Sequence, residues 1–440
     1  MASITTISKR WQEEGLKYAK SVNKFVNKGM TLGWEKVGKE PKETRTDLAE
    51  KVIQFVREYN EMGNIDDLRE KFPPAHAPFI EMLEENGRSI GPILLLNSNK
   101  ILVRVGSAYE KGEIFLIDGP NISSIKDIIS FGRLPNRKYF AIAKSSGVEV
   151  YEGWEGRQAA RLNWPTSLEG IPKDINIERR KGVPPITQLL PFPDGKRVLL
   201  VSSEGIFVLP TDGSIRLYPG AKEIQEYLNW LKEEHPPRKT AGMHIDMAHG
   251  AISADGKFIA IGGQDSHHLI FNDKYELIGN VGPMSEYPHY SIFSEDNDML
   301  ACNSCHFYNG ITIGVPLSLL PNLETESYSL DDRLVMLEGQ SRIYAAVFQN
   351  DKLILGDAYG YLRAVDKKGN LLWEHFIGSS IGDIDISPDG KMLVASTYAG
   401  FLSIIALDTG KPDPYTIGTS THREIRRWLF WKKEKRPLAW

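Results

Sequence analysis

Two consecutive stretches decide the fold: AHGAISADGKFIAIGGQDSHHLIF at residues 248–271 and PHYSIFSEDNDMLACNSCHFYNGITIGV at residues 288–315. In each stretch a short apolar strand leads into a turn, and a second apolar strand follows the turn. The turns are Asp255-Gly256 and Asp296-Asn297, which are residue pairs typical of β-hairpins. Aligned on these turns, the stretches repeat at 41 residues, so they are two copies of one β unit.

The same unit recurs from about residue 91 to residue 415. Seven such units can be counted, and a mostly apolar strand of similar composition follows each inner turn: ILVRVG, YFAIAK, RVLLVSS, FIAIGGQ, MLACNS, LILGDA and MLVAST. A self-similar β unit of roughly 40 to 60 residues is typical of a propeller, whose blades are four-stranded sheets. We therefore predict a mainly β fold, a seven-bladed β-propeller with an N-terminal α-helical segment. The inner turns are expected near residues 97–100, 135–137, 193–195, 255–256, 296–297, 350–351 and 388–390.

The last three units resemble known repeat families. SPDGKMLVAS at residues 387–396 is similar to the inner hairpin of WD40-like and YVTN-like blades. AVDKKGNLLW at residues 364–373 resembles the blade repeat of PQQ-type quinoproteins, and ALDTGK at residues 406–411 is similar to its first half. The Gly-His and Trp-Asp signatures of WD40 repeats are absent. The resemblance therefore indicates a divergent WD40-like or PQQ-like propeller and implies a fold, not a function.

The chain divides into three parts. Residues 1–90 carry apolar side chains at three-to-four spacing, which predicts helices that pack on the propeller, with Asp47 as the N-cap of the second helix. The propeller is expected over residues 91–415. Two insertions are expected within it, at about 160–182 and 217–245; the second contains a helix at 221–234 and an exposed linker at 235–239. Residues 416–440 are left as a basic and aromatic tail.

Bulk composition excludes several classes of protein. The net charge is −4 and the isoelectric point is near 6.2, so the chain as a whole is not basic enough for a typical nucleic-acid-binding protein. The first 20 residues lack the apolar segment of a secretory signal, and no apolar run approaches the roughly 20 residues of a membrane span. Two cysteines three positions apart form no disulfide framework. We expect a cytoplasmic monomer without a transmembrane span.

The tail at residues 423–440 interleaves Arg and Lys with Trp and Phe. This pattern would suit nucleic acid, through phosphate contacts and base stacking, or an anionic membrane surface. In the alternative interpretation, Trp428, Phe430 and Trp431 pack on the propeller or on the N-terminal helices. We favour packing, because the rest of the chain is acidic, and we do not expect a nucleic-acid partner.

Six of the ten histidines lie between residues 244 and 306. In an antiparallel hairpin, the start of one strand and the end of the next meet at one edge of the sheet. The histidines that precede or end these strands should therefore gather on one rim of two adjacent blades. There they would bond backbone groups of the loops, contact a partner, or hold a metal. The candidate binding residues are His244, Asp246, His249, Asp265, His267, His268, His289 and His306.

Cofactors are not expected, with a divalent metal on this rim as the alternative. Its ligands would come from His249, Asp265, His289, Cys305 and His306. Residues 302–306 also match the C-x-x-C-H pattern of c-type haem attachment. Haem c is not expected, because cysteines three apart on a strand face opposite sides, and Cys302 reads as a small buried residue. PQQ is not expected either, since the resemblance lies only in the blade turns.

The functional prediction is a non-catalytic binding protein that contacts another protein through the rim formed by residues 244–308. A scaffold in a complex and a toxin-neutralising, immunity-type binder both fit this description. The alternative is a metal-assisted, lactonase-like hydrolase or lyase with a His/Asp site in the mouth of the propeller. His244 and Asp246 would share one face of an extended strand, as an acid/base pair requires. Hydrolase, kinase and dinucleotide-binding signatures are absent.

Overall fold

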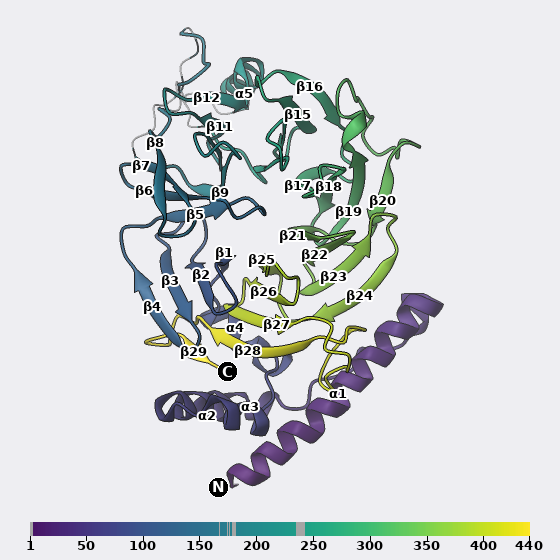
Figure 1. Cartoon of the computed structure of the whole chain (residues 1–440). Helices are drawn as coiled ribbons and strands as arrows, with labels where there is room; N and C mark the ends of the chain where they lie inside the picture. Colours follow the sequence, from purple (N-terminus) through teal and green to yellow (C-terminus); the bar gives the residue numbers. More distant parts are fainter. Residues whose placement is uncertain (1–2, 167, 174, 176, 178–181, 235–242) are drawn as a thin grey trace.

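Seven β-sheets arranged in a ring form the body of the protein (Figure 1). The computed structural model describes residues 3–440 apart from 167, 174, 176, 178–181 and 235–242. Each sheet consists of consecutive antiparallel strands. The first strand of each sheet contacts the first strand of the next, and the seventh sheet contacts the first in the same way. The ring is therefore closed, and the predicted seven-bladed β-propeller with an N-terminal helical segment is confirmed.

The blades follow one another along the chain. Blade 1 contains β1 (Ile90–Leu95), β2 (Lys100–Val105), β3 (Glu113–Asp118) and β4 (Asn121–Ile125). Blade 2 contains β5 (Ser130–Arg133), β6 (Tyr139–Lys144), β7 (Gly147–Glu152) and β8 (Arg157–Leu162). Blade 3 contains β9 (Ile186–Pro191), β10 (Val198–Ser202), β11 (Gly205–Leu209) and β12 (Ile215–Tyr218). Blades 4 and 5 contain β13 (His249–Ile252), β14 (Phe258–Gly262), β15 (His268–Asn272) and β16 (Leu277–Val281); β17 (Tyr287–Phe293), β18 (Met299–His306), β19 (Asn309–Pro316) and β20 (Val335–Glu338). Blades 6 and 7 contain β21 (Ile343–Gln349), β22 (Lys352–Asp357), β23 (Tyr361–Asp366) and β24 (Leu371–Phe376); β25 (Ile381–Ile386), β26 (Met392–Thr397), β27 (Phe401–Ala406), β28 (Arg423–Leu429) and β29 (Leu438–Ala439).

All seven predicted inner turns join the first and second strands of a blade. The repeat of 41 residues has a clear physical basis. In the turn of blade 4, the hydroxyl of Ser253 donates to Asp255 (2.8 Å) and accepts from the backbone N–H of Phe258 (2.9 Å). Ser294 makes the equivalent pair of bonds in blade 5, with Asp296 (2.6 Å) and Met299 (2.9 Å). A short polar pattern thus sets the turn and the register of the strand that follows.

The helical segment lies outside the ring, beside blade 7 (Figure 1). Leu48, rather than Asp47, occupies the N-cap position of the second helix, and its side chain makes no capping bond. Asp47 instead pairs with Arg10 of the first helix at 2.7 Å, so the capping prediction is wrong. The segment comprises α1 (Ile4–Leu32), α2 (Ala49–Met62), α3 (Ile65–Lys71) and α4 (Ile80–Asn86), with short 3-10 turns at Trp34–Lys36, Thr46–Leu48 and Ala77–Phe79.

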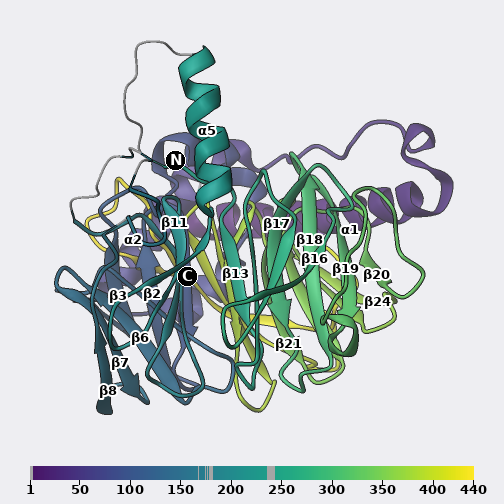
Figure 2. The same cartoon turned by 90° about the horizontal axis from the view of Figure 1, so that it is seen from above.

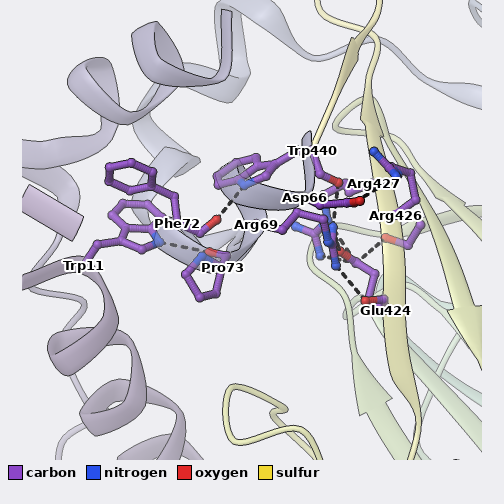
Figure 3. A network of polar contacts seen from close by, with 10 residues as sticks. Trp11, Asp66, Arg69, Phe72, Pro73, Glu424, Arg426, Arg427 and Trp440 are labelled. Atoms are coloured by element: carbon purple, nitrogen blue, oxygen red, sulfur yellow. Dashed lines mark hydrogen bonds and ion pairs between the residues drawn. The ribbon is translucent and has the colours of Figure 1, made fainter. Parts of the chain in front are cut away.

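A shared aromatic core joins the helical segment to the end of the chain. Trp11 and Trp440 are both fully buried, with ring centroids 6.3 Å apart, and Phe79 packs against both. The indole N–H of Trp440 donates to Phe72 O (2.7 Å), and that of Trp11 donates to Pro73 O (2.9 Å; Figure 3). Each ring therefore buries its apolar surface while its polar atom is satisfied. These contacts fix the helices to the outer edge of blade 7.

The predicted C-terminal tail belongs to blade 7. Residues 423–429 form β28, which pairs with β27, and β29 adds a fifth strand. Trp428, Phe430 and Trp431 are at most 3% exposed, so they pack in the core as the alternative interpretation of the tail supposed. The blade therefore extends beyond the boundary expected at residue 415.

The second insertion forms the predicted helix, α5 (Ala221–Glu234), whose buried face carries Ile224, Leu228 and Leu231. The linker expected at residues 235–239 lies outside the described residues. Figure 2 shows α5 rising away from the blades. Within the part of the chain that the structure describes, no helix combines the length and apolar character that a membrane crossing requires.

The ring has two unlike faces. We call the face on which the first strands begin the entry face. The turns between second and third strands and the connections between blades, including α5, belong to it, because neighbouring strands run in opposite directions. The opposite, exit face carries the seven inner turns. The histidine-rich segments fall on the entry face or just inside it.

Candidate functional site

A cavity of about 1260 Å³ occupies the centre of the ring. Residues from the first strands of all seven blades form its wall, so the cavity is the central channel. Its two ends differ in chemistry. Tyr109, Asp246, Arg342, Tyr344 and Tyr398 line the end at the entry face, whereas Asn136, Arg137, Glu295 and Pro388 line the end at the exit face.

His249 and His268 form a buried pair inside blade 4. They are 2% and 1% exposed, and His249 Nε2 lies 3.0 Å from His268 Nδ1. His249 donates from Nδ1 to Met247 O (2.9 Å), so its Nε2 accepts a hydrogen bond from Nδ1–H of His268. Burial lowers the pKa of His249 to about 4, and burial lowers that of His268 well below its usual value. Both rings are therefore neutral at pH 7, and both nitrogens of His249 are engaged.

His289 is held in the same neutral state at the channel wall. It donates from Nδ1 to Ile343 O (2.7 Å), and its Nε2 accepts from Arg342 at 2.8 Å. Burial, followed by the positive charge of Arg342, keeps the pKa of His289 well below its usual value. Its ring meets Tyr344 edge-on, and Tyr344 meets Tyr398 in the same way, each with centroids 5.1 Å apart. A continuous row of rings thus crosses blades 5, 6 and 7 at the entry mouth.

The other predicted rim residues are more accessible. His244 lies 3.0 Å from Asp246, and His306 lies 2.6 Å from Glu286, all with side chains between 43% and 61% exposed. The ring of His244 also approaches Tyr109 of blade 1, with centroids 6.3 Å apart. His267 bonds Asn280 (2.9 Å) and Ser327 (3.3 Å), and Asp265 is exposed in the turn between β14 and β15.

The five residues suggested as metal ligands do not converge. Within the described ranges, no three His, Cys, Asp or Glu side chains form a group that could hold a metal ion. His249 and His289 use both ring nitrogens for protein contacts, and the Sγ of Cys305 instead lies 4.0 Å from the Sδ of Met247. The histidine-rich rim is therefore a set of separate contacts, in which His249 and His289 have both ring nitrogens engaged.

Cys302 and Cys305 lie on β18 and are both buried. Cys302 packs in the core between blades 4 and 5, with its sulfur 3.9 Å from Ser291 Oγ. Burial raises the pKa of Cys302 to about 12 and also raises that of Cys305. Thiols held protonated in this way are poor nucleophiles. Cys302 thus has the surroundings of a small core residue, as the sequence suggests.

Exposed aromatic rings on the entry face were missed in the sequence. Of the described residues in the propeller, every aromatic side chain that is strongly exposed lies on this face or on α5. Tyr328, in the connection from β19 to β20, reaches this face because its backbone N–H bonds Pro283 O, just beyond the end of β16. A sequence signal was available, since a tyrosine follows the second strand in four blades (SAY, CHFY, DAY and STY). The exposed aromatic residues, from 43% to 74% exposed, are Tyr109, Trp230, Phe307, Tyr308, Tyr328, Tyr359 and Tyr398.

A charged group inside the channel was also missed. Asp383 and Asp385 stand two residues apart on β25 and accept backbone N–H bonds from Ile93 (2.8 Å) and Leu95 (2.6 Å) of β1. Arg133 of β5 forms a buried ion pair with Asp385. Burial raises the pKa of Asp383 to about 7. Alternate residues of a strand share a face, so the motif IGDIDI contained this signal.

Comparison with known proteins adds little. The sequence matches no protein-family model and no curated protein. The fold is similar to the crystal structure of a computationally designed protein, Ika8, at 14% identity and a TM-score of 0.43, covering 73% of this chain and 97% of that one. It is also similar to the propeller of Dos1, at 12% identity and a TM-score of 0.44, covering 73% and 93%. At this distance neither structure bears on function.

Proposed function

We propose that this protein is a non-catalytic binding platform that holds a partner protein on its entry face. The observation that carries the proposal is the concentration of exposed aromatic rings on that face. Phe307 and Tyr308, in the turn between β18 and β19 of blade 5, are 74% and 57% exposed. Aromatic side chains are enriched in the energetically dominant parts of protein interfaces, because each buries a large area at little conformational cost.

The histidines of the entry face support binding rather than catalysis. A general base or metal ligand needs a free ring nitrogen. His249 and His289, which line the channel, have both nitrogens engaged by protein groups. Their role is to hold the wall of the mouth in shape, so that the aromatic turns above it are presented on a rigid base.

The charges among the rings indicate the kind of partner. Asp246, Asp265 and Glu286 are exposed on the same rim as the aromatic turns. Carboxylates beside aromatic faces favour lysine and arginine, through ion pairs and cation–π contacts. A basic segment of the partner is therefore the expected ligand. A scaffold within a complex and a toxin-neutralising binder would both use this surface.

Site-specific photo-crosslinking tests the proposal. A photoreactive residue replaces Tyr308 on the entry face or, as the matched control, Asn350 in an exit-face turn, and the chain is exposed to extract from its own source organism. We expect one protein to be crosslinked from position 308 and not from position 350. The purified partner should then bind Phe307→Ala and Tyr308→Ala at least tenfold more weakly, which corresponds to about 1.4 kcal/mol each. Crosslinks confined to position 350, or unchanged affinity of both variants, would contradict the proposal.

The lactonase-like reaction is the rival proposal, and His244 with Asp246 is its best remaining pair. The two side chains are 3.0 Å apart at the mouth of the channel. Elemental mass spectrometry of the purified chain separates the two functions. A stoichiometric metal that is lost in a His244→Ala/Asp246→Ala double variant would favour the enzyme. A metal-free, folded chain that still captures its partner would favour binding.

A further inference from the structure

A second cavity lies far from the channel, between the helical segment and blade 7. It has a volume of about 120 Å³. Residues of α1, α3 and the turn before α4 form one side of it, and β24, β28 and residues 413–417 form the other. Three groups matter for its chemistry: Arg69 of α3, His76, and Arg427 of β28.

Three arginines and two carboxylates line this crevice: Arg45, Arg69 and Arg427, with Asp413 and Glu424. Arg427 bonds Glu424 through Nε (3.1 Å) and Nη2 (2.7 Å), and Arg69 lies 3.5 Å from the same carboxylate (Figure 3). Two guanidinium groups therefore share one carboxylate, and Arg69 also donates to Trp440 O and Glu424 O, at 2.6 Å each. A third, Arg45, has its own partner in Glu43, at 2.8 Å. The remaining carboxylate of the wall, Asp413, is half-buried and accepts from the backbone N–H of Tyr415 (2.9 Å).

Two buried polar atoms of the same wall have no partner. Arg427 is only 5% exposed, yet its Nη1 makes no hydrogen bond within the described part of the chain, and neither does His76 Nε2. Leaving a buried polar group unpaired is costly, most of all on a charged side chain. Burial lowers the pKa of His76 to about 4, so the ring is neutral at pH 7, and its tautomer with the proton on Nε2 is a donor.

We propose that this crevice binds a small oxyanion of the phosphate or sulfate type, with Arg427 Nη1 and His76 Nε2 as donors. One water needs only about 10–15 Å³ of such space, so the crevice has room for a tetrahedral ion. Guanidinium groups bind phosphate oxygens through strong, charge-assisted hydrogen bonds. The ion would satisfy the two buried donors that lack a partner. It would also join the segment around His76 to β28, and so hold the helical segment on the propeller.

Isothermal titration calorimetry of the full chain with sodium phosphate, against sodium chloride at equal ionic strength, tests the proposal. We expect saturable binding of one phosphate and a rise in the melting temperature that chloride does not reproduce. Arg427→Gln should weaken phosphate at least tenfold. Arg426→Gln on the same strand is the matched control and should bind normally, since Arg426 is not among the residues that line the crevice and its guanidinium bonds the exposed Asp66 at 3.4 Å. Phenyl phosphate as a second titrant distinguishes a free ion from a phosphoryl group carried by a larger molecule.

Arg427 also bonds Glu424, so its loss could prevent folding. His76→Ala provides the second variant, because His76 Nε2 has no protein partner to lose among the described residues. This variant should fold and bind phosphate several-fold more weakly. If the folded wild-type chain shows no saturable phosphate binding, the crevice holds only water and the proposal fails. It fails equally if His76→Ala and a folded Arg427→Gln bind phosphate as tightly as the wild type.

Discussion

Asp385 accepts a hydrogen bond from the backbone N–H of Leu95 at 2.6 Å, which joins the last blade of the propeller to the first. The two residues are 290 positions apart. Each of the seven sheets is made of consecutive strands, so no strand is exchanged between the ends of the ring. Closure rests on side chains such as Asp385 and on the packing of β1 against β25.

Asp385→Asn should destabilise the ring. The change removes the negative charge that the buried Arg133 needs, and breaking a buried ion pair from one side costs about 3–5 kcal/mol. We expect a loss of that size in the free energy of unfolding, measured by urea denaturation. Asp351→Asn is the control, because the Asp351 side chain is 92% exposed. Equal stabilities of the two variants would show that the carboxylate is not needed for closure.

Asp383 should make the stability of the chain depend on pH. Burial raises the pKa of Asp383 to about 7 in the folded state, whereas an unfolded aspartate titrates near about 3.9. The folded chain therefore holds a proton that the unfolded chain releases. The contribution of Asp383 to the free energy of unfolding is fully present below about pH 4 and is lost as pH rises to about 7. The loss is on the order of 4 kcal/mol.

The measurement compares wild type with Asp383→Asn in urea at pH 4 to 8. His249 works in the opposite direction: burial lowers its pKa to about 4, so its stabilising contribution is present above about pH 6.5 and is lost as pH falls. Because both chains contain His249, its contribution cancels in the difference between their free energies of unfolding. The free energy of unfolding of the wild type, minus that of Asp383→Asn, should decline between pH 4 and 7 and then level off. A difference that does not change with pH would mean that Asp383 is charged throughout.

Trp11→Ala should release the helical segment from the propeller. Trp11 is fully buried against Phe79 and Trp440, and large-to-small changes of this kind cost about 3–5 kcal/mol. We expect faster proteolysis within residues 33–45 and a lower melting temperature. Trp34→Ala, in the same segment but at a site 53% exposed, should cost less than about 1 kcal/mol. Similar protease sensitivity of both variants would argue against a clamping role for Trp11.

Local patterns explain why the blades could be predicted from the sequence. Ser253 and Ser294 begin turns whose bonds are made within five residues, so the sequence displays both ends of each interaction. The candidate site was only partly predictable. Its histidines were found because they mark strand ends. The two groups that His289 bonds, however, belong to Arg342 and Ile343 of the next blade. No local spacing predicts such contacts.

The sequence by itself determined the repeating β unit, the positions of its turns and the number of blades, because hairpins depend on neighbours along the chain. The tertiary structure alone decided how the ring closes, which histidines stay neutral, and where the last strands go. Residues 423–429 look like a charged tail in the sequence, yet they complete blade 7, because Trp428 and Trp440 find their burial against residues hundreds of positions earlier. Such contacts depend on the closed ring, and the surface they create exists only after folding.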